Sequence, residues 1–232
     1  MQKEEKQVKI TTPMAIIVAG FLVMVGIILS GGVNVEKKEK TLSQQLGISK
    51  EKITECLTGL NAEELSNKFV ASVSKATNLE GFGTPYMVIA SDNGLKTEIR
   101  GAETYEHFKQ IISDMSNGSV ATPYEGGIIL DEEGDHVYGN PKAPIKIIEY
   151  SDYQCGYCNK VHSILEQVVN ESEGQVSWTF RHMPILGQDS LTKAMVGECV
   201  AKIKGNDAFW KYSKLIFDSN KPAEQKSFTE SL

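Results

Sequence analysis

The sequence has few cysteines, no excess of positive charge and no low-complexity segment. Four cysteines in 232 residues are too few for a small domain held together by disulfides. The net charge of -6 argues against nucleic acid as a partner, because proteins that bind phosphate backbones carry basic surfaces. The composition, 41% hydrophobic and 23% charged, is that of a globular protein with one or two domains.

Residues 14–33 contain no charged side chain, and this stretch is twenty residues long. A helix needs about 20 apolar residues to cross a bilayer. The stretch is longer than the apolar core of a secretory signal peptide, which is roughly 7–15 residues, and no Ala-x-Ala cleavage site follows it. We therefore predict an uncleaved transmembrane anchor at 14–33 rather than a cleaved signal peptide.

Lysines do not set the orientation of this anchor, because three precede it and three follow it. Only residues 1–13 precede the span, whereas about 200 residues of globular sequence follow. We therefore expect 1–13 to be a cytoplasmic tail, 34–40 to be a linker, and 41–232 to lie outside the cytoplasm as part of a single-pass membrane protein. Disulfides form and persist in that compartment.

Cys155-Gly156-Tyr157-Cys158, the CGYC motif, stands between a predicted strand and a predicted helix. Residues 145–150 are apolar and β-prone, and apolar side chains recur at helical intervals over 159–169. The start of a helix offers unpaired backbone N–H groups and the positive end of the helix dipole. Both favour the thiolate, which is the reactive form of cysteine. The motif is therefore predicted to be a redox pair.

Half of a zinc site is the alternative interpretation of this motif. Such a site would need a second pair of ligands, and Cys56, Cys199 and the four histidines show no paired spacing. We therefore expect no metal and no cofactor. His162 and His182 are expected to pack in the interior or to lie at the surface.

The rest of the chain alternates between helical and strand patterns, which predicts an α/β fold. Three helices are expected before Gly81, the third beginning after Asn61. The later elements are expected to be strands at 84–90, 95–100, 145–150 and 176–183, with helices at 103–115, 159–169, 190–204 and 207–217.

Four segments resemble DsbA-like thiol:disulfide oxidoreductases. The first is Gly139-Asn-Pro-Lys-Ala-Pro-Ile-Lys-Ile-Ile-Glu-Tyr-Ser-Asp-Tyr-Gln-Cys-Gly-Tyr-Cys158, which is similar to the opening of that family. The others are Arg181-His-Met-Pro-Ile185, Gly197-Glu-Cys199-Val and Asn206-Asp-Ala-Phe-Trp210. The resemblance implies a thioredoxin fold with an inserted helical subdomain.

Motifs of the family's later half occur early in this chain. They are Glu55-Cys56-Leu57, Gly83-Thr84-Pro85-Tyr-Met-Val-Ile89 and Gly101-Ala-Glu-Thr-Tyr-Glu-His-Phe108. Residues 41–116 thus resemble the family's C-terminal half and 141–232 its N-terminal half, with 117–140 as a linker. Each element occurs once, so we favour a circularly permuted domain. A truncated tandem protein, or a dimer that exchanges halves, is also compatible with this order.

The resemblance assigns roles to residues around the CGYC motif. Cys155 would be the nucleophile and Cys158 the resolving thiol. Pro85 would follow a cis peptide bond beside the cysteines, and Thr84 and Tyr86 would help to bind substrate peptide. An ordinary proline at the start of a strand is the alternative.

Other residues receive roles in the same way. Glu149 would be a buried acid that exchanges a proton with the inner thiol, or it faces solvent. Tyr153 and Tyr157 would line a peptide-binding rim, or they pack. Cys56 and Cys199 would form a structural disulfide, or they are buried free thiols.

These expectations describe a membrane-anchored, extracytoplasmic oxidoreductase acting on cysteines of exported proteins, with a membrane redox partner. The Gly-Tyr dipeptide resembles that of periplasmic disulfide isomerases more than the Pro-His of the strongest oxidants. A disulfide isomerase or reductase fed by a membrane electron donor is therefore one alternative. A peptide-binding, chaperone-like module with a structural CxxC disulfide is another.

Overall fold

The computed structural model describes residues 40–77 and 83–219. The predicted tail, the predicted anchor at 14–33 and most of the predicted linker lie outside these residues, as do the last residues of the chain. Among the described residues, no helix is both long enough and apolar enough to cross a membrane.

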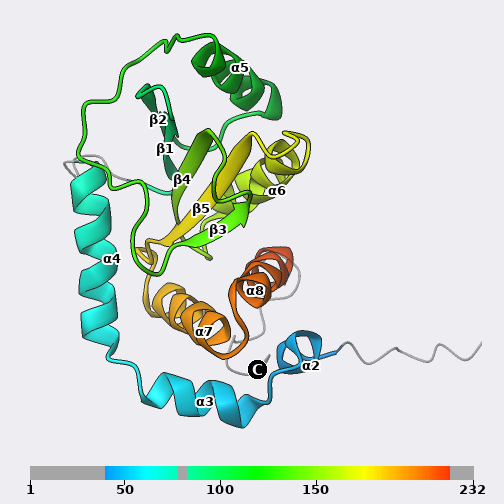
Figure 1. The fold of residues 1–232 in the computed structure, drawn as a ribbon. Coiled ribbons are helices and arrows are strands. Elements are labelled where there is room, and N and C mark those ends of the chain that lie inside the picture. The colour runs from blue at the N-terminus through cyan, green and yellow to red at the C-terminus, as the bar shows by residue number, and fades with distance from the viewer. Residues whose placement is uncertain (1–39, 78–82, 220–232) are drawn as a thin grey trace, which may run out of the picture. The chain divides into compact units, whose positions relative to one another are not determined.

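Twelve helices and strands make up the described part of the chain (Figure 1). In order they are α2 (Leu42–Leu46), α3 (Lys50–Thr58), α4 (Ala62–Ala76), β1 (Tyr86–Ser91), β2 (Lys96–Arg100), α5 (Tyr105–Ser116), β3 (His136–Gly139), β4 (Ile145–Ser151), α6 (Gly156–Asn170), β5 (Val176–His182), α7 (Gln188–Lys204) and α8 (Asn206–Ser219).

Side chains at the helix starts explain why the first helices begin where they do. The Thr41 side chain accepts from the backbone of Gln44, whose own side chain accepts from Thr41, a reciprocal capping box at the start of α2. The Asn61 side chain accepts from two backbone N–H groups at the start of α4, as its position predicts. Gly47 ends α2 in the left-handed conformation, with φ 62°.

Both halves of the chain contribute to one five-stranded mixed sheet, in the order β2-β1-β4-β5-β3. Strands β4 and β5 are parallel, and all other neighbours are antiparallel. Strand β1 from the first half pairs with β4 from the second, with Ile89 opposite Ile147. The two strands predicted to lie side by side therefore do so.

The segment predicted to be a linker, 117–140, contains strand β3 at its end. This strand pairs antiparallel with β5 at the edge of the sheet. Gly139 has φ 85°, and a Cβ at this position would stand 2.5 Å from the Val169 side chain. Before the strand, Ile128 is buried against the sheet. The prediction of a plain linker is wrong because a four-residue edge strand among Gly, Asp and Glu gives almost no periodic signal.

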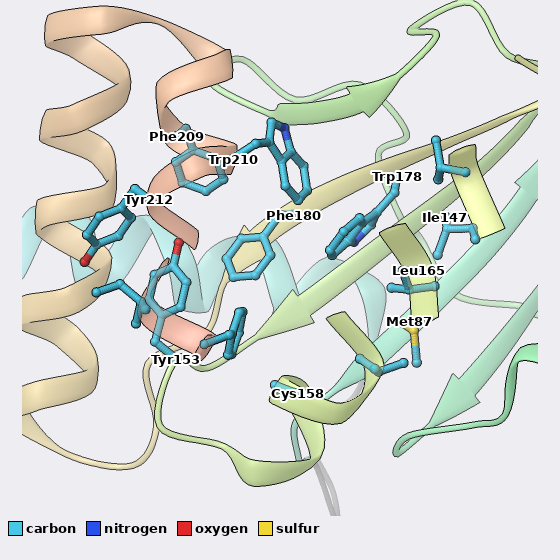
Figure 2. Packing of buried hydrophobic residues seen from close by; sticks show 14 of the residues in the cluster. Met87, Ile147, Tyr153, Cys158, Leu165, Trp178, Phe180, Phe209, Trp210 and Tyr212 are labelled. Atoms are coloured by element: carbon cyan, nitrogen blue, oxygen red, sulfur yellow. The ribbon is translucent and has the colours of Figure 1, made fainter. Parts of the chain in front are cut away.

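The sheet is covered on both faces. On one face, side chains from α5, α6 and α8 pack against alternate strand residues such as Ile147 and Phe180, around a group of aromatic rings (Figure 2). On the other face, Val73 and Ala76 of α4 pack against Val88 and neighbouring residues. Strand β1 is covered on both faces and is accordingly apolar at almost every position, from Tyr86 to Ala90.

A disulfide joins Cys56 of α3 to Cys199 of α7, with their Cα atoms 5.8 Å apart. The two residues are separated by 143 positions. This bond is the one that the family resemblance implied, and it ties the first half of the chain covalently to the second.

Candidate active site

Cys155 is the N-cap residue of α6, at the end of strand β4. Its side chain caps no backbone group, so its sulfur is available at the start of the helix. The buried carboxylate of Asp152 shapes the preceding turn, because it accepts from the backbone N–H groups of Gln154, Ile185 and Leu186. Local sequence patterns do not single out Asp152, since two of its three partners, Ile185 and Leu186, lie in another loop.

The segment before β1 meets this sulfur from the other half of the chain. The Thr84–Pro85 peptide bond is cis. The Cys155 sulfur lies 3.1 Å from the Thr84 carbonyl oxygen, to which the protonated thiol donates, across 71 positions of sequence. The fold therefore places Thr84 and Pro85 beside the CGYC motif, as the resemblance implied.

The two thiols of the motif differ strongly in their electrostatics. The pKa of Cys155 is lowered to about 5, because a hydrogen bond from the Cys158 side chain outweighs the rise that burial causes. Burial raises the pKa of Cys158 far above its ordinary value, and the bond to Cys155 and the charge of Glu149 raise it further. Cys155 is thus held as the thiolate and Cys158 as the thiol.

Glu149 lies in the interior and not at the surface, which settles the two alternatives for its position. Its side chain is completely buried, and burial raises its pKa to about 8. Trp178 Nε1 donates to Glu149 Oε2 at 3.0 Å, whereas Oε1 has no hydrogen-bond partner. The negative charge of Cys155 raises the pKa of Glu149 further, and the charge of Glu149 raises the pKa of Cys158. The carboxyl group and the two sulfurs are therefore electrostatically coupled.

Two of the three predicted tyrosines do not face a substrate. Tyr86 is buried, and its hydroxyl donates to Glu98 at 2.8 Å. Tyr153 is buried among aromatic rings, where its hydroxyl shares a hydrogen bond with Ser213 (Figure 2). For these side chains the predicted contact with substrate is wrong, because both fill space beside the sheet.

Tyr157 is different, since its side chain is 63% exposed beside the motif. His162, by contrast, packs edge-on against Trp178 in the interior. Burial, and then the charge of Lys214, lower the pKa of His162 to about 3. This histidine is therefore a neutral packing residue.

The sequence around the CGYC motif is similar to known thioredoxin-like proteins. The sequence model of a thioredoxin family matches residues 131–231, which include β3 and the CGYC motif. The Probable disulfide bond formation protein D of Bacillus anthracis is 31% identical over 97 residues, which is 40% of this chain and 44% of that protein. The resemblance to DsbA-like thiol:disulfide oxidoreductases is confirmed. The mixed sheet with its helices is accordingly a thioredoxin-like α/β fold.

Solved DsbA-like structures match part of the chain. Pseudomonas aeruginosa DsbA2 is 30% identical and covers 38% of this chain and 50% of its own, with a TM-score of 0.36. Bacillus subtilis BdbD is 27% identical, covering 40% of this chain and 52% of its own, with a TM-score of 0.37.

A second group of relatives is larger than this chain. The Na(+)/H(+) antiporter NhaA 3 of Salinispora tropica is 26% identical over 106 residues, which is 44% of this chain and 16% of that protein. The chain therefore spans less than half the length of the curated relatives that it matches.

Proposed function

We propose that this protein is a thiol:disulfide oxidoreductase that acts on cysteines of exported proteins through Cys155 and Cys158. The observation that carries the proposal is the contrast between the two sulfurs. Cys155 starts α6, contacts Thr84 and has a pKa of about 5, whereas Cys158 is completely buried with a raised pKa. Such a contrast suits one thiol for attack and departure at the helix start and the other for resolution from within.

The oxidative half-reaction begins with a disulfide between Cys155 and Cys158. A substrate thiolate attacks the Cys155 sulfur, and Cys158 departs and takes up a proton, for which Glu149 is the nearby donor. A second substrate thiolate then attacks the substrate sulfur of this mixed disulfide and releases Cys155 as the thiolate. Two electrons pass from the substrate to the CGYC motif, so a separate membrane electron acceptor must reoxidise it.

We propose oxidation of substrates as the working direction. A thiolate stabilised at Cys155 lowers the free energy of the dithiol form, which makes the disulfide a stronger oxidant. Isomerase or reductase action, which the Gly-Tyr dipeptide favoured, would require a less stabilised thiolate.

Equilibration with glutathione tests this direction. A dedicated oxidase should show a reduction potential near about -120 mV, whereas an isomerase should lie near about -180 mV. A potential below about -300 mV would identify a structural disulfide and favour the peptide-binding alternative.

We further propose that residues 14–33 anchor the protein in the cell membrane with the redox site outside the cytoplasm. The uncharged length of this stretch supports the proposal. Membrane fractions should retain the protein after washing at high pH, and an impermeant thiol reagent added to intact cells should label Cys155. Release of the protein into the soluble fraction would contradict the anchor.

We also propose that one permuted chain forms the complete site. Support comes from the pairing of β1 with β4 and from the contact between Cys155 and Thr84, because both join the two halves. In a permuted chain residues 227–232 are expected to pack near 41–48, but 227–232 lie outside the described residues. Light scattering on the detergent-solubilised, active protein should give the mass of one chain, whereas an obligate dimer would favour exchanged halves.

A further inference from the structure

A second group of polar side chains is buried behind the redox site. His136 lies at the start of β3, His182 at the end of β5, and Glu198 in the middle of α7. Both histidines are buried, and the Glu198 side chain is 26% exposed. These three residues are called the HHE cluster below.

The ligand atoms of the HHE cluster are spaced as they would be around one small cation. His136 Nε2 lies 3.1 Å and His182 Nε2 lies 3.4 Å from Glu198 Oε1, and all three lie within 4.8 Å of one another. Zinc binds imidazole nitrogen and carboxylate oxygen at about 2.0–2.2 Å in tetrahedral geometry, which sets ligand atoms about 3.3–3.5 Å apart. The two distances to Glu198 Oε1 are close to that spacing.

The surrounding structure holds the two imidazole rings in place. His136 stacks on Phe209 with ring centroids 3.6 Å apart. Gly197 lets α7 approach β5, because a Cβ at this position would stand 3.4 Å from His182 Cε1. This close approach brings the next residue, Glu198, to the two rings.

One ligand atom has no directed hydrogen bond in the present arrangement. His182 Nε2 is buried without a hydrogen-bond partner, although Glu198 Oε1 lies 3.4 Å away. A buried nitrogen without a partner is costly, so a bound cation would satisfy it. A cavity of about 40 Å³ beside the cluster has room for a water as a further ligand.

Charges near the cluster do not oppose a cation. The Arg181 guanidinium faces this cavity, but it binds both carboxylate oxygens of Asp135 at 2.8 Å and lies 3.6 Å from Glu132. Lys68 reaches the Glu133 carbonyl oxygen. The carboxylate of Glu198 therefore stands against two imidazoles with no unbalanced guanidinium beside it.

We propose that His136, His182 and Glu198 bind a divalent transition-metal ion of the Zn²⁺ class, with water as the fourth ligand. Imidazole and carboxylate ligands suit this class of ion. The ion would tie β3, β5 and α7 together. The expectation of no metal considered only local pairs of ligands, and these three residues come together only in the folded chain.

The test uses the detergent-solubilised full chain with the CGYC motif oxidised, so that its sulfurs cannot bind the ion. Isothermal titration with Zn²⁺ should give one equivalent per chain. At a concentration 100 times the Kd, Zn²⁺ should raise Tm by roughly 5–10 °C. Bound Co²⁺ should show the strong visible bands of four-coordinate cobalt without thiolate charge-transfer absorption.

Two variants locate the ion. Glu198→Gln keeps the shape of the side chain but removes its charge, and it should weaken Zn²⁺ binding at least a hundredfold, since even loss of a partner to a ligand costs roughly 10–100-fold. The matched control is His107→Gln. His107 is outside the HHE cluster and forms a half-exposed pair with Glu103 at 2.9 Å, so the Zn²⁺ affinity of this variant should equal that of the unaltered protein.

Titration of the unaltered protein with Zn²⁺ or Co²⁺ is by itself a test of the proposed metal site. Failure of the oxidised chain to bind one equivalent of Zn²⁺ or Co²⁺ would overturn the proposal. So would unchanged affinity in Glu198→Gln, or cobalt spectra dominated by thiolate absorption.

Discussion

The two cysteine pairs of this protein have opposite chemistry within one fold. Cys155 and Cys158 are free and three positions apart, whereas Cys56 and Cys199 are bonded across 143 positions. Cys199 lies inside a helix, while Cys155 begins one and contacts the backbone of the other half of the chain. The difference teaches that reactivity depends on the position of a thiol relative to a helix start and not on exposure, because Cys155 is buried while Cys56 is half-buried.

Replacing Cys155, the sulfur at the helix start, should break this comparison most completely. Cys155→Ser should reduce disulfide exchange with a model dithiol peptide to background, because no other free thiol among the described residues starts a helix. The fold should be retained, since Cys155 makes no capping bond with its side chain. Far-UV circular dichroism is the control, and residual exchange in a folded variant would transfer the role to another residue.

Removing the bonded pair should affect stability instead of chemistry. The double variant Cys56→Ala/Cys199→Ala should lower the free energy of unfolding by about 2–5 kcal/mol, because the bond closes a long loop. Urea unfolding of both proteins measures this change. The pKa of Cys155 should stay near 5 in the folded variant. A shift towards the ordinary thiol value would mean that the disulfide helps to build the redox site.

Alkylation of the reduced protein sharpens the contrast between the thiol at the helix start and the thiol inside the helix. With a pKa of about 5 against an ordinary value of 9.0, Cys155 should be mostly thiolate at pH 6. Its lower intrinsic nucleophilicity offsets part of this advantage, so its labelling rate should exceed that of an ordinary thiol by roughly 10–100-fold. Mass spectrometry of the labelled peptides gives the rates, and preferential labelling of Cys158 would refute the assignment.

The pKa of Cys155 also determines how the stability of the folded dithiol form depends on pH. The Cys155 pKa is depressed in the folded dithiol form, so its thiolate stabilises that form most at high pH. This stabilisation is lost as the pH falls through about 5.

The smallest effect on disulfide exchange is expected from replacing Glu149, the buried acid. Glu149→Gln should slow release of the mixed disulfide by about tenfold, because a neutral amide cannot exchange a proton with Cys158. Burial raises the pKa of Glu149 to about 8, so ionisation destabilises the fold as the pH rises above about 4.5. The variant should therefore be more stable than the parent at pH 8, which urea unfolding measures. Equal exchange rates in stopped-flow mixing would remove Glu149 from the mechanism.

Elements that are marked by a local sequence pattern could be predicted from the sequence. The CGYC motif between a strand and a helix, the cap at Asn61 and the Gly47 stop all appear where their patterns predict. The family resemblance supplied the long-range pairs, Cys155 with Thr84 and Cys56 with Cys199.

Other features depend on strand register and packing, which local patterns do not contain. Trp178 reaches Glu149 only because β4 and β5 run side by side. Tyr86 and Tyr153 turn inward and pack beside the sheet. Strand β3 has only four residues, which is too short for a recognisable sequence pattern. The residues of the HHE cluster have no characteristic spacing in the sequence, so no motif indicates them.

The hydrogen bond from Trp178 to Glu149 gives this protein a built-in optical signal. The chain contains only two tryptophans, and the indole of one of them donates to the acid beside the redox pair. The other, Trp210, has its ring 4.4 Å from that of Trp178. Ionisation of Glu149 changes the electric field on the Trp178 ring, so the emission spectrum of the unlabelled protein should follow turnover in real time.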